Sequence, residues 1–292
     1  MIERGDDGTR SDLDLPAWSE PFRSDLRGRL ERARPFEPGS AQSWLGSTGA
    51  GVTVAIVDSG VEGDHPAVGG RLVRSVRVEL RGEEAEVVDD EPVDVVGHGT
   101  ACAGIIHALA PDAGIVSVRV LGQNNTAKGL AFAHGLDWVI DQGIGVANLS
   151  LSSRSEDLFG TFHELVDHAY FANTVLVCAA SNHPGQSSYP SLFSSVISVA
   201  AHDVRDPLTW FYNPRPPVEF GAWGVEVPLA WRGGSTMTGT GNSFATPHIA
   251  GLVARIRATY PTATPFEVKS LLAAGARDAR DPLTRTPEDS AA

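Results

Sequence analysis

The stretch VTVAIVDSG, residues 52–60, is an unbroken apolar and β-branched run that ends in an aspartate and a Ser-Gly turn signal. A strand covered by helices on both faces shows such a continuous run, whereas a half-exposed strand alternates between apolar and polar residues. Similar runs follow at 114–120, 146–151, 174–181 and 195–201. The sequence therefore predicts a mostly parallel sheet whose first strand carries Asp58 to its carboxyl end.

Helix-like segments lie between and after these runs, with apolar residues recurring every three or four positions. They cover residues 130–143, 158–172, 243–260 and 265–276. Alternating strands and helices predict an α/β fold with helices on both faces of the sheet. In such a fold the reactive groups gather beyond the carboxyl ends of the strands.

Length and composition indicate one main domain. The 292 residues are 42% hydrophobic and 20% charged, which suffices for a sizeable buried core. The predicted domain covers residues 46–280, between a polar N-terminal extension over 1–45 and a polar tail over 281–292. We find no internal repeat.

Charge excludes several classes of partner. A formal net charge of -13 and a pI near 5.1 oppose binding to nucleic acid or to an anionic membrane. No stretch approaches the roughly 18 apolar residues of a membrane span. The first 16 residues, MIERGDDGTRSDLDLP, are acidic where a secretory signal is basic, so we expect a cytoplasmic protein. Cys102 and Cys178 lie in apolar segments and are expected to be inert buried thiols.

Four polar residues follow strands or begin helices, where the fold would present them at one edge of the sheet: Asp58, His98, Asn182 and Ser243. Each has an ordinary structural alternative, namely a turn aspartate, a buried helix-start histidine, a turn asparagine and a serine N-cap. Ser243 opens the helical stretch SFATPHIAGLVA. The free N–H groups and the dipole of a helix start stabilise negative charge on a bound carbonyl oxygen.

A metal site is the other chemistry considered for His98. Cys102 lies four residues further on, so the two side chains could share one face of a helix. No second cluster of ligands with metal-site spacing accompanies them. The sequence therefore predicts no metal at this position.

These segments resemble the signatures of the subtilisin-like serine protease family over residues 45–276. DSG at 58–60, HGT at 98–100 and SFATPH at 243–248 match the family's three motifs, and the order Asp, His, Ser is the family's order. The resemblance implies the three-layer α/β/α subtilisin-like fold with a mostly parallel central sheet. It also implies a serine endopeptidase.

The roles implied by this resemblance follow residue by residue. Asp58, His98 and Ser243 correspond to the catalytic triad, and Asn182 corresponds to the side-chain donor of the oxyanion hole. Such hydrolysis proceeds through an acyl-enzyme intermediate and requires no cofactor. The partner is a protein or peptide bound in extended form, whereas the oligomeric state stays open.

The segment 146–153 resembles the family strand that pairs with the substrate and lines the pocket for the residue before the cleaved bond. The substrate contacts that this implies are Leu149, Ser150, Leu151, Ser152, Ala180 and Ser181. Ser152 and Ser181 stand where the family usually has glycine. Their side chains predict a narrower pocket that prefers a small substrate residue before the cleaved bond. Asn242 replaces the usual Thr before the nucleophile.

Two features of the family leave alternatives open. The extension over 1–45 is too short for the folded pro-domain of secreted relatives, so it either lies across the active site or is a disordered tail. Many relatives bind structural calcium, but we find no clean loop signature, and we expect the acidic run DDEP at 89–92 to be a solvated loop.

We therefore expect an active endopeptidase that acts on a specific intracellular protein or precursor peptide. The alternative is a catalytically silent module of the same fold that binds extended peptides or a protein partner. All four polar groups are intact, which favours activity because the members of a triad work as a unit. An α/β-hydrolase is excluded by the chain order and by the lack of a G-x-S-x-G elbow.

Overall fold

The computed structural model describes residues 43–82, 84–124, 129–183, 185–215 and 217–277. Its elements are, in chain order, η3 (Ser43–Gly46), β1 (Thr53–Asp58), η4 (Pro66–Val68), β2 (Leu72–Arg81), β3 (Glu84–Asp89), α2 (His98–Leu109), β4 (Gly114–Arg119), α3 (Gly129–Asp141), β5 (Val146–Leu149), η5 (Glu156–Leu158), α4 (Phe159–Phe171), β6 (Val175–Ala179), β7 (Ile197–His202), β8 (Trp210–Tyr212), β9 (Phe220–Trp223), β10 (Val227–Trp231), β11 (Ser235–Gly239), α5 (Asn242–Thr259) and α6 (Pro265–Gly275).

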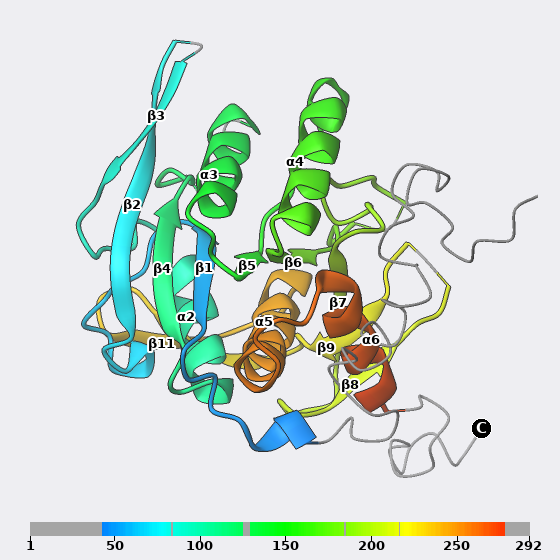
Figure 1. Ribbon diagram of the computed structural model, residues 1–292. Coiled ribbons are helices and arrows are strands. Elements are labelled where there is room, and N and C mark those ends of the chain that lie inside the picture. The colour runs from blue at the N-terminus through cyan, green and yellow to red at the C-terminus, as the bar shows by residue number, and fades with distance from the viewer. Residues whose placement is uncertain (1–42, 83, 125–128, 184, 216, 278–292) are drawn as a thin grey trace, which may run out of the picture. The chain divides into compact units, whose positions relative to one another are not determined.

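The central sheet is mostly parallel, as predicted. Its strand order in the described residues is β3-β2-β4-β1-β5-β6-β7-β9-β8. Neighbours from β2 to β9 run parallel, and only the outer pairs β2–β3 and β8–β9 are antiparallel. The five apolar runs of the sequence form the middle of this sheet, where helices cover both faces (Figure 1).

Helices form a layer on each face of the sheet. In Figure 1, α3 and α4 lie on one face, and α2, α5 and α6 lie on the other. The apolar run of β1 serves both layers because successive side chains of a strand point to opposite faces. Ala55 and Val57 join the core that α3 and α4 form, so Asp58 points to the side of α2 and α5.

Helix α5 is the central helix of its layer. It contacts α2, α6, η3 and the strands β5, β6, β7 and β9, and most of its residues are buried. Burial extends to His248, whose Nδ1 lies 2.9 Å from the carbonyl oxygen of Phe244. Burial lowers the pKa of His248 to about 4, although that hydrogen bond partly opposes the shift. The histidine is therefore neutral in the folded protein near pH 7.

The β2–β3 hairpin was not predicted. Its strands alternate charged and apolar residues, as in RVELR at 77–81, so they lack the continuous apolar pattern of the central strands. In the run DDEP, Asp89, Glu91 and Pro92 are exposed, as expected of a solvated loop. Asp90 is the exception, because its carboxylate is almost fully buried and paired with Arg77 at 3.0 Å and Arg119 at 2.6 Å.

The ends of the predicted domain fall largely outside the described residues, which exclude 1–42 and 278–292. The predicted extension and tail therefore stay predictions. Trp44 nevertheless shows that the folded unit begins before residue 46. Its indole is fully buried with its ring centroid 5.6 Å from that of Trp210, and Leu45 accepts a hydrogen bond from Arg255.

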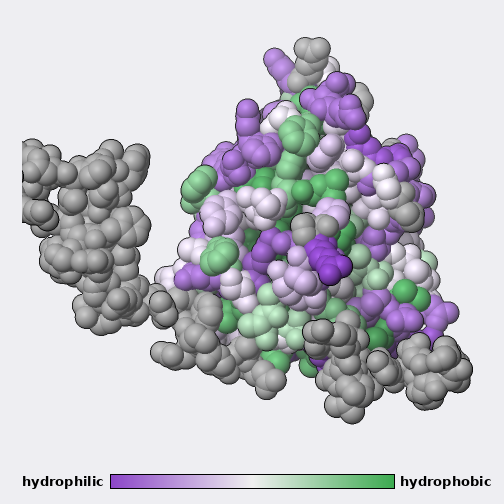
Figure 2. All heavy atoms as spheres, turned by 90° about the vertical axis from the view of Figure 1, so that its right-hand side faces the viewer, coloured by the Kyte–Doolittle hydropathy of each residue, from purple (hydrophilic) through white to green (hydrophobic). Residues whose placement is uncertain are grey.

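On the face of the molecule shown in Figure 2, hydrophilic residues are interspersed with several small hydrophobic patches. Among the described helices, none combines the length and the apolar composition that crossing a bilayer requires.

Replacing His248 tests the cost of burying a neutral imidazole. The unfolded chain takes up this proton near the ordinary pKa of 6.5, but the folded protein does so only near 4. The free energy of unfolding therefore decreases by up to about 3 kcal/mol as the pH falls from 6.5 to 4, because only the unfolded chain is protonated at this position. Urea unfolding of His248→Asn at pH 7.5 and 4.5, in a Ser243→Ala background, should show a smaller loss on acidification than the parent. An equal loss in both proteins would contradict this account.

Candidate active site

Asp58 and His98 form a buried hydrogen-bonded pair. The His98 Nδ1 atom lies 2.9 Å from Oδ1 and 2.8 Å from Oδ2 of Asp58. Asp58 is fully buried and His98 is 8% exposed. Oδ1 also accepts a hydrogen bond of 2.7 Å from the backbone N–H of Ser59. A buried carboxylate needs such partners, because an unpaired charge is costly outside water.

The pair requires a close approach of two elements. Asp58 ends β1, and His98 is the first residue of α2. A Cβ at Gly99 would lie 2.0 Å from the carbonyl oxygen of Gly60 and 3.3 Å from the Cβ of Asp58. The glycine of the HGT motif therefore lets the helix start reach the strand end.

The surroundings of His98 strengthen it as a base. Burial alone lowers the pKa of its imidazole, but the charge of Asp58, the hydrogen bond that His98 donates to that carboxylate and the charge of Asp94 together outweigh burial. The net pKa of His98 is therefore raised above its ordinary value. An imidazole that holds a proton more strongly is better suited to take one from a hydroxyl.

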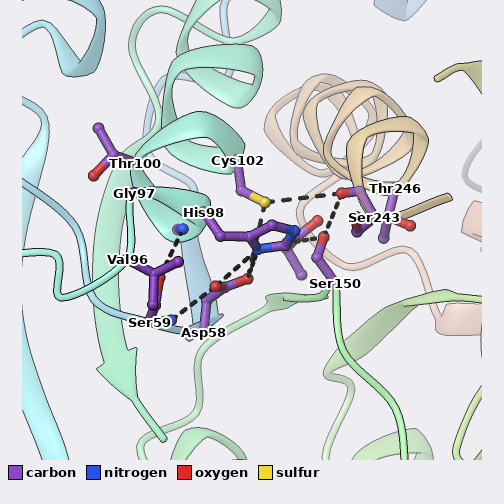
Figure 3. A network of polar contacts seen from close by, with 12 residues as sticks. Asp58, Ser59, Val96, Gly97, His98, Thr100, Cys102, Ser150, Ser243 and Thr246 are labelled. Atoms are coloured by element: carbon purple, nitrogen blue, oxygen red, sulfur yellow. Dashed lines mark hydrogen bonds and ion pairs between the residues drawn. The ribbon is translucent and has the colours of Figure 1, made fainter. Parts of the chain in front are cut away.

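Ser243 lies in the first turn of α5, and its backbone is held by two neighbouring elements (Figure 3). Pro247 has no N–H, so it cannot donate the helical hydrogen bond to the carbonyl of Ser243. That carbonyl instead accepts from Ser150 Oγ at 2.8 Å and from Cys102 Sγ at 3.8 Å. The proline of the PH motif thus frees the carbonyl of Ser243 to bind the segment that follows β5 and helix α2.

Asn182 is also tied to the start of α5. Its Oδ1 accepts the backbone N–H of Asn242 at 2.9 Å. This contact occupies the oxygen end of the amide and leaves the NH2 end as the donor. Sequence analysis assigned Asn182 to the oxyanion hole, and the structure places it beside the cavity that Ser243 and His98 line.

The side chain of Asn242 connects the start of α5 to the loop after β6 and to strand β7, a role that sequence analysis did not assign. Its Nδ2 donates to the carbonyls of Ala180 at 3.2 Å and Ser181 at 2.9 Å, and its Oδ1 accepts from the N–H of Ala201 at 2.8 Å. The only signal in the sequence was its position next to Ser243.

A cavity of about 650 Å³ brings these groups together. Its lining residues include His98, Ser243, Asn182, Leu121, Gly129, Phe132, Ser150, Leu151, Ser152, Ser153, Arg154, Ser155, Ala179, Ala180, Ser181, His183 and Gln186. Five of the six predicted substrate contacts lie on this lining. Arg154, His183 and Gln186 come from loops without strand or helix patterns, so the sequence offered no signal for them.

Leu149 requires a correction. Its side chain is fully buried in the core beneath α3 and α4 and is not part of the cavity lining. The alternation along β5 explains the difference, because Ala147 and Leu149 share one face of the sheet whereas the next residue, Ser150, points to the other.

Cys102 lies next to the Asp58–His98 pair, with its Sγ 4.0 Å from Oδ2 of Asp58. It is fully buried, and burial together with the charge of Asp58 raises the pKa of its thiol well above the ordinary value. Burial likewise raises the pKa of Cys178. Both thiols are therefore protonated and poorly reactive.

Two groups of side chains within the described residues have a geometry that could hold a metal ion. One is Asp58, His98 and Cys102, and the other is Asp137, Asp141 and His168. In the first group Asp58 and His98 already bind each other, and the thiol is protonated. The second group is partly or fully exposed and lies between α3 and α4.

The comparison with known proteins agrees with this geometry. Residues 49–288 match the model of the subtilase family, peptidase S8. The chain belongs to the subtilase family. Its similarity extends to subtilisin BL of Lederbergia lenta, 34% identical over 240 residues, covering 78% of this chain and 84% of that protein. Thermitase of Thermoactinomyces vulgaris is 32% identical over 222 residues, covering 72% and 76%.

Other subtilases are longer than this chain. The thermostable alkaline protease of Halalkalibacterium halodurans is 33% identical over 236 residues, which cover 77% of this chain but 62% of that protein. Among solved structures, a cold-adapted subtilisin-like serine proteinase has a TM-score of 0.64 at 28% identity, covering 78% of this chain and 83% of its own. The S41 psychrophilic protease has a TM-score of 0.67 at 25% identity, covering 81% and 88%. These likenesses confirm the predicted subtilisin-like fold.

Asn242→Ala tests the link between the start of α5, the loop after β6 and strand β7. The substitution leaves one N–H and two carbonyls that Asn242 satisfies without partners, so the backbone around Ser243 should shift. We expect kcat on a peptide substrate to fall roughly 10- to 100-fold, since small displacements of reacting groups are costly. Thr240→Ala is the matched control in the same segment. Equal turnover in both variants would show that Asn242 does not position the site.

Proposed function

We propose that this subtilase hydrolyses peptide bonds within proteins, with Asp58, His98 and Ser243 as its catalytic triad. The observation that carries the proposal is the buried Asp58–His98 pair, with Nδ1 2.8 Å from Oδ2, at a cavity that Ser243 and Asn182 also line. No cofactor is needed for such chemistry.

In the first step, His98 takes the proton of the Ser243 hydroxyl as its oxygen attacks the scissile carbonyl. Asp58 binds Nδ1–H, which orients the ring and leaves Nε2 as the base. The protonated imidazole is stabilised by the adjacent carboxylate. It then gives the proton to the leaving amine, and an acyl-enzyme remains. In the second half of the reaction His98 takes a proton from water, which attacks the acyl-enzyme, and returns that proton to Ser243.

Charge on the carbonyl oxygen is stabilised by two donors. The amide NH2 of Asn182 is one, and the backbone N–H of Ser243 at the start of α5 is the other. In subtilisin itself, the established example of this device, losing the asparagine costs about 10²–10³ in turnover. We expect a similar cost for Asn182→Ala.

The substrate that we propose is a specific protein or precursor peptide, bound as an extended strand beside Ser150–Ser152. Ser152 and Ser181, two residues of the cavity lining, support a preference for a small side chain before the cleaved bond. Both bring a side chain to a position that sequence analysis associates with glycine. They reduce the room for a large residue.

Labelling with a fluorophosphonate probe tests the activity. The full-length protein should react at Ser243, as located by mass spectrometry, and Ser243→Ala should not react. Reaction only after removal of residues 1–42, which leaves the buried Trp44 in place, would support activity and assign an inhibitory role to the removed residues. No reaction of either form would contradict the proposal and favour the catalytically silent binding module.

Replacing Ser152 and Ser181 by glycine tests whether their side chains limit the size of the pocket. Ser152→Gly combined with Ser181→Gly should raise kcat/KM for peptides with Phe or Leu before the cut, relative to Ala, by roughly 10-fold, the usual scale for apolar pocket changes. Ser155→Gly, also on the cavity lining, serves as the control. An unchanged preference would show that these serines do not set the size of the pocket.

We further propose that the protein acts inside the cell. One relative, from Bacillus subtilis, is named a minor extracellular protease, so the location of this chain has to be tested directly. Fractionation of the producing cells with an antibody tests it. Recovery of the protein from the medium would contradict it.

A further inference from the structure

Asp94 accepts more hydrogen bonds than its place in a loop suggests. It lies between β3 and α2, is partly buried, and lines no part of the cavity. Its Oδ1 accepts from Ser59 Oγ at 2.7 Å, Val96 N at 2.9 Å and Gly97 N at 2.7 Å. Its Oδ2 accepts from the N–H and the hydroxyl of Thr100, at 2.8 and 2.7 Å. One carboxylate thus joins the end of β1 to the start of α2.

On the β1 side, the connection runs through Ser59. This residue is fully buried, and its N–H donates to Oδ1 of Asp58. Its hydroxyl donates to Asp94 and accepts from the N–H of Gly99 at 3.1 Å. A bridge between Gly60 and Asp94 adds backbone pairing to the same junction. A displacement of Asp94 would therefore displace Ser59 and, through its N–H, the carboxylate of Asp58.

On the α2 side, Asp94 does the work of an N-cap. The cap position is Gly97, which has no side chain to accept a hydrogen bond. It has to be glycine, because φ is +117° and a Cβ would lie 2.6 Å from the indole of Trp231. The first-turn N–H groups of Gly99 and Thr100 are instead accepted by Ser59 and Asp94.

Asp94 is also a second negative charge near His98. The titratable or hydroxyl groups that face this imidazole in the described part of the chain are Asp58 from β1, Cys102 from its own helix, Ser243 from α5, and Asp94. The ring of Phe244 packs beside it at 5.2 Å between centroids. The thiol is neutral, so two carboxylates set the charge around the ring.

We propose that Asp94 is a positioning residue of the triad, which fixes the start of α2 against the end of β1 and whose charge strengthens His98 as a base. This rests on the proteolytic function proposed above. Asp94 touches neither substrate nor reacting atoms in that mechanism. It acts through Ser59, the first turn of α2 and the electric field at the imidazole.

The pH dependence separates the charge from the hydrogen bonds. Asp94→Asn removes the charge, so the pKa of His98 should fall, and the acid limb of kcat/KM should move to lower pH. At pH 8, kcat should drop roughly 10-fold or more from misplacement of the dyad, with KM little changed. Asp94→Glu should keep the limb near its original position. Asp89→Asn, an exposed carboxylate of the same segment, is the matched control.

Ser59→Ala keeps the charge and removes the connecting hydroxyl. We expect its kcat to fall while its acid limb stays in place. If Asp94→Asn fails to fold, Ser59→Ala still tests whether the hydrogen bond between Ser59 and Asp94 supports turnover. An acid limb that stays or moves to higher pH in Asp94→Asn, or turnover like the parent in both variants, would overturn the proposal.

A direct titration makes the result independent of proteolysis. In a Ser243→Ala background, NMR of labelled histidine gives the pKa of His98, assigned with His98→Gln. It should be lower in Asp94→Asn than in the parent, and unchanged in Asp89→Asn. If the parent neither cleaves peptides nor reacts with the probe, the proposed function fails. If it is active but Asp94→Asn leaves His98 unchanged, only the role of Asp94 fails.

Discussion

The fold of this subtilase has to bury a negative charge at the end of its first central strand. Asp58 is wholly inaccessible to solvent, and its partners are the imidazole of His98 and the N–H of Ser59. Leaving such a carboxylate unpaired would cost several kcal/mol. The approach of α2 to β1, the glycine at 99 and the polar contacts around the junction all serve that pairing. The pairing of Asp58 with His98 is therefore also a condition for the stability of the core.

Ser243 is held in place by a different set of contacts. Helix α5 is apolar and buried, and its packing alone would fix the axis of the helix more firmly than the position of its first turn. Pro247 frees the carbonyl of Ser243 for Ser150, and Asn242 holds the neighbouring loops. These directional contacts fix the backbone of the first turn, which packing of the helix alone would hold less firmly.

The sequence predicted what depends on local pattern. Continuous apolar runs identified the central strands, and the motifs around Asp58, His98 and Ser243 identified residues that the fold gathers beside one cavity or in direct contact. The outer strands β2 and β3 were missed because they alternate charged and apolar residues and so lack the continuous apolar run that identifies a central strand. Leu149 was misassigned because a motif names a strand but not the face toward which each side chain points. The contact of Asp94 with Ser59 and the contacts of Asn242 join segments distant in sequence, which no local pattern reveals.

These long-range contacts share a physical cause. The carboxyl ends of parallel strands bring together loops whose backbone groups no strand or helix satisfies, and each buried group needs a partner. Asp94 and Asn242 each accept or donate several hydrogen bonds at such a junction. A single polar side chain that satisfies three segments fixes their relative position more tightly than separate contacts would. The relative positions of Asp58, His98 and Ser243 are therefore held by side chains that do not line the cavity.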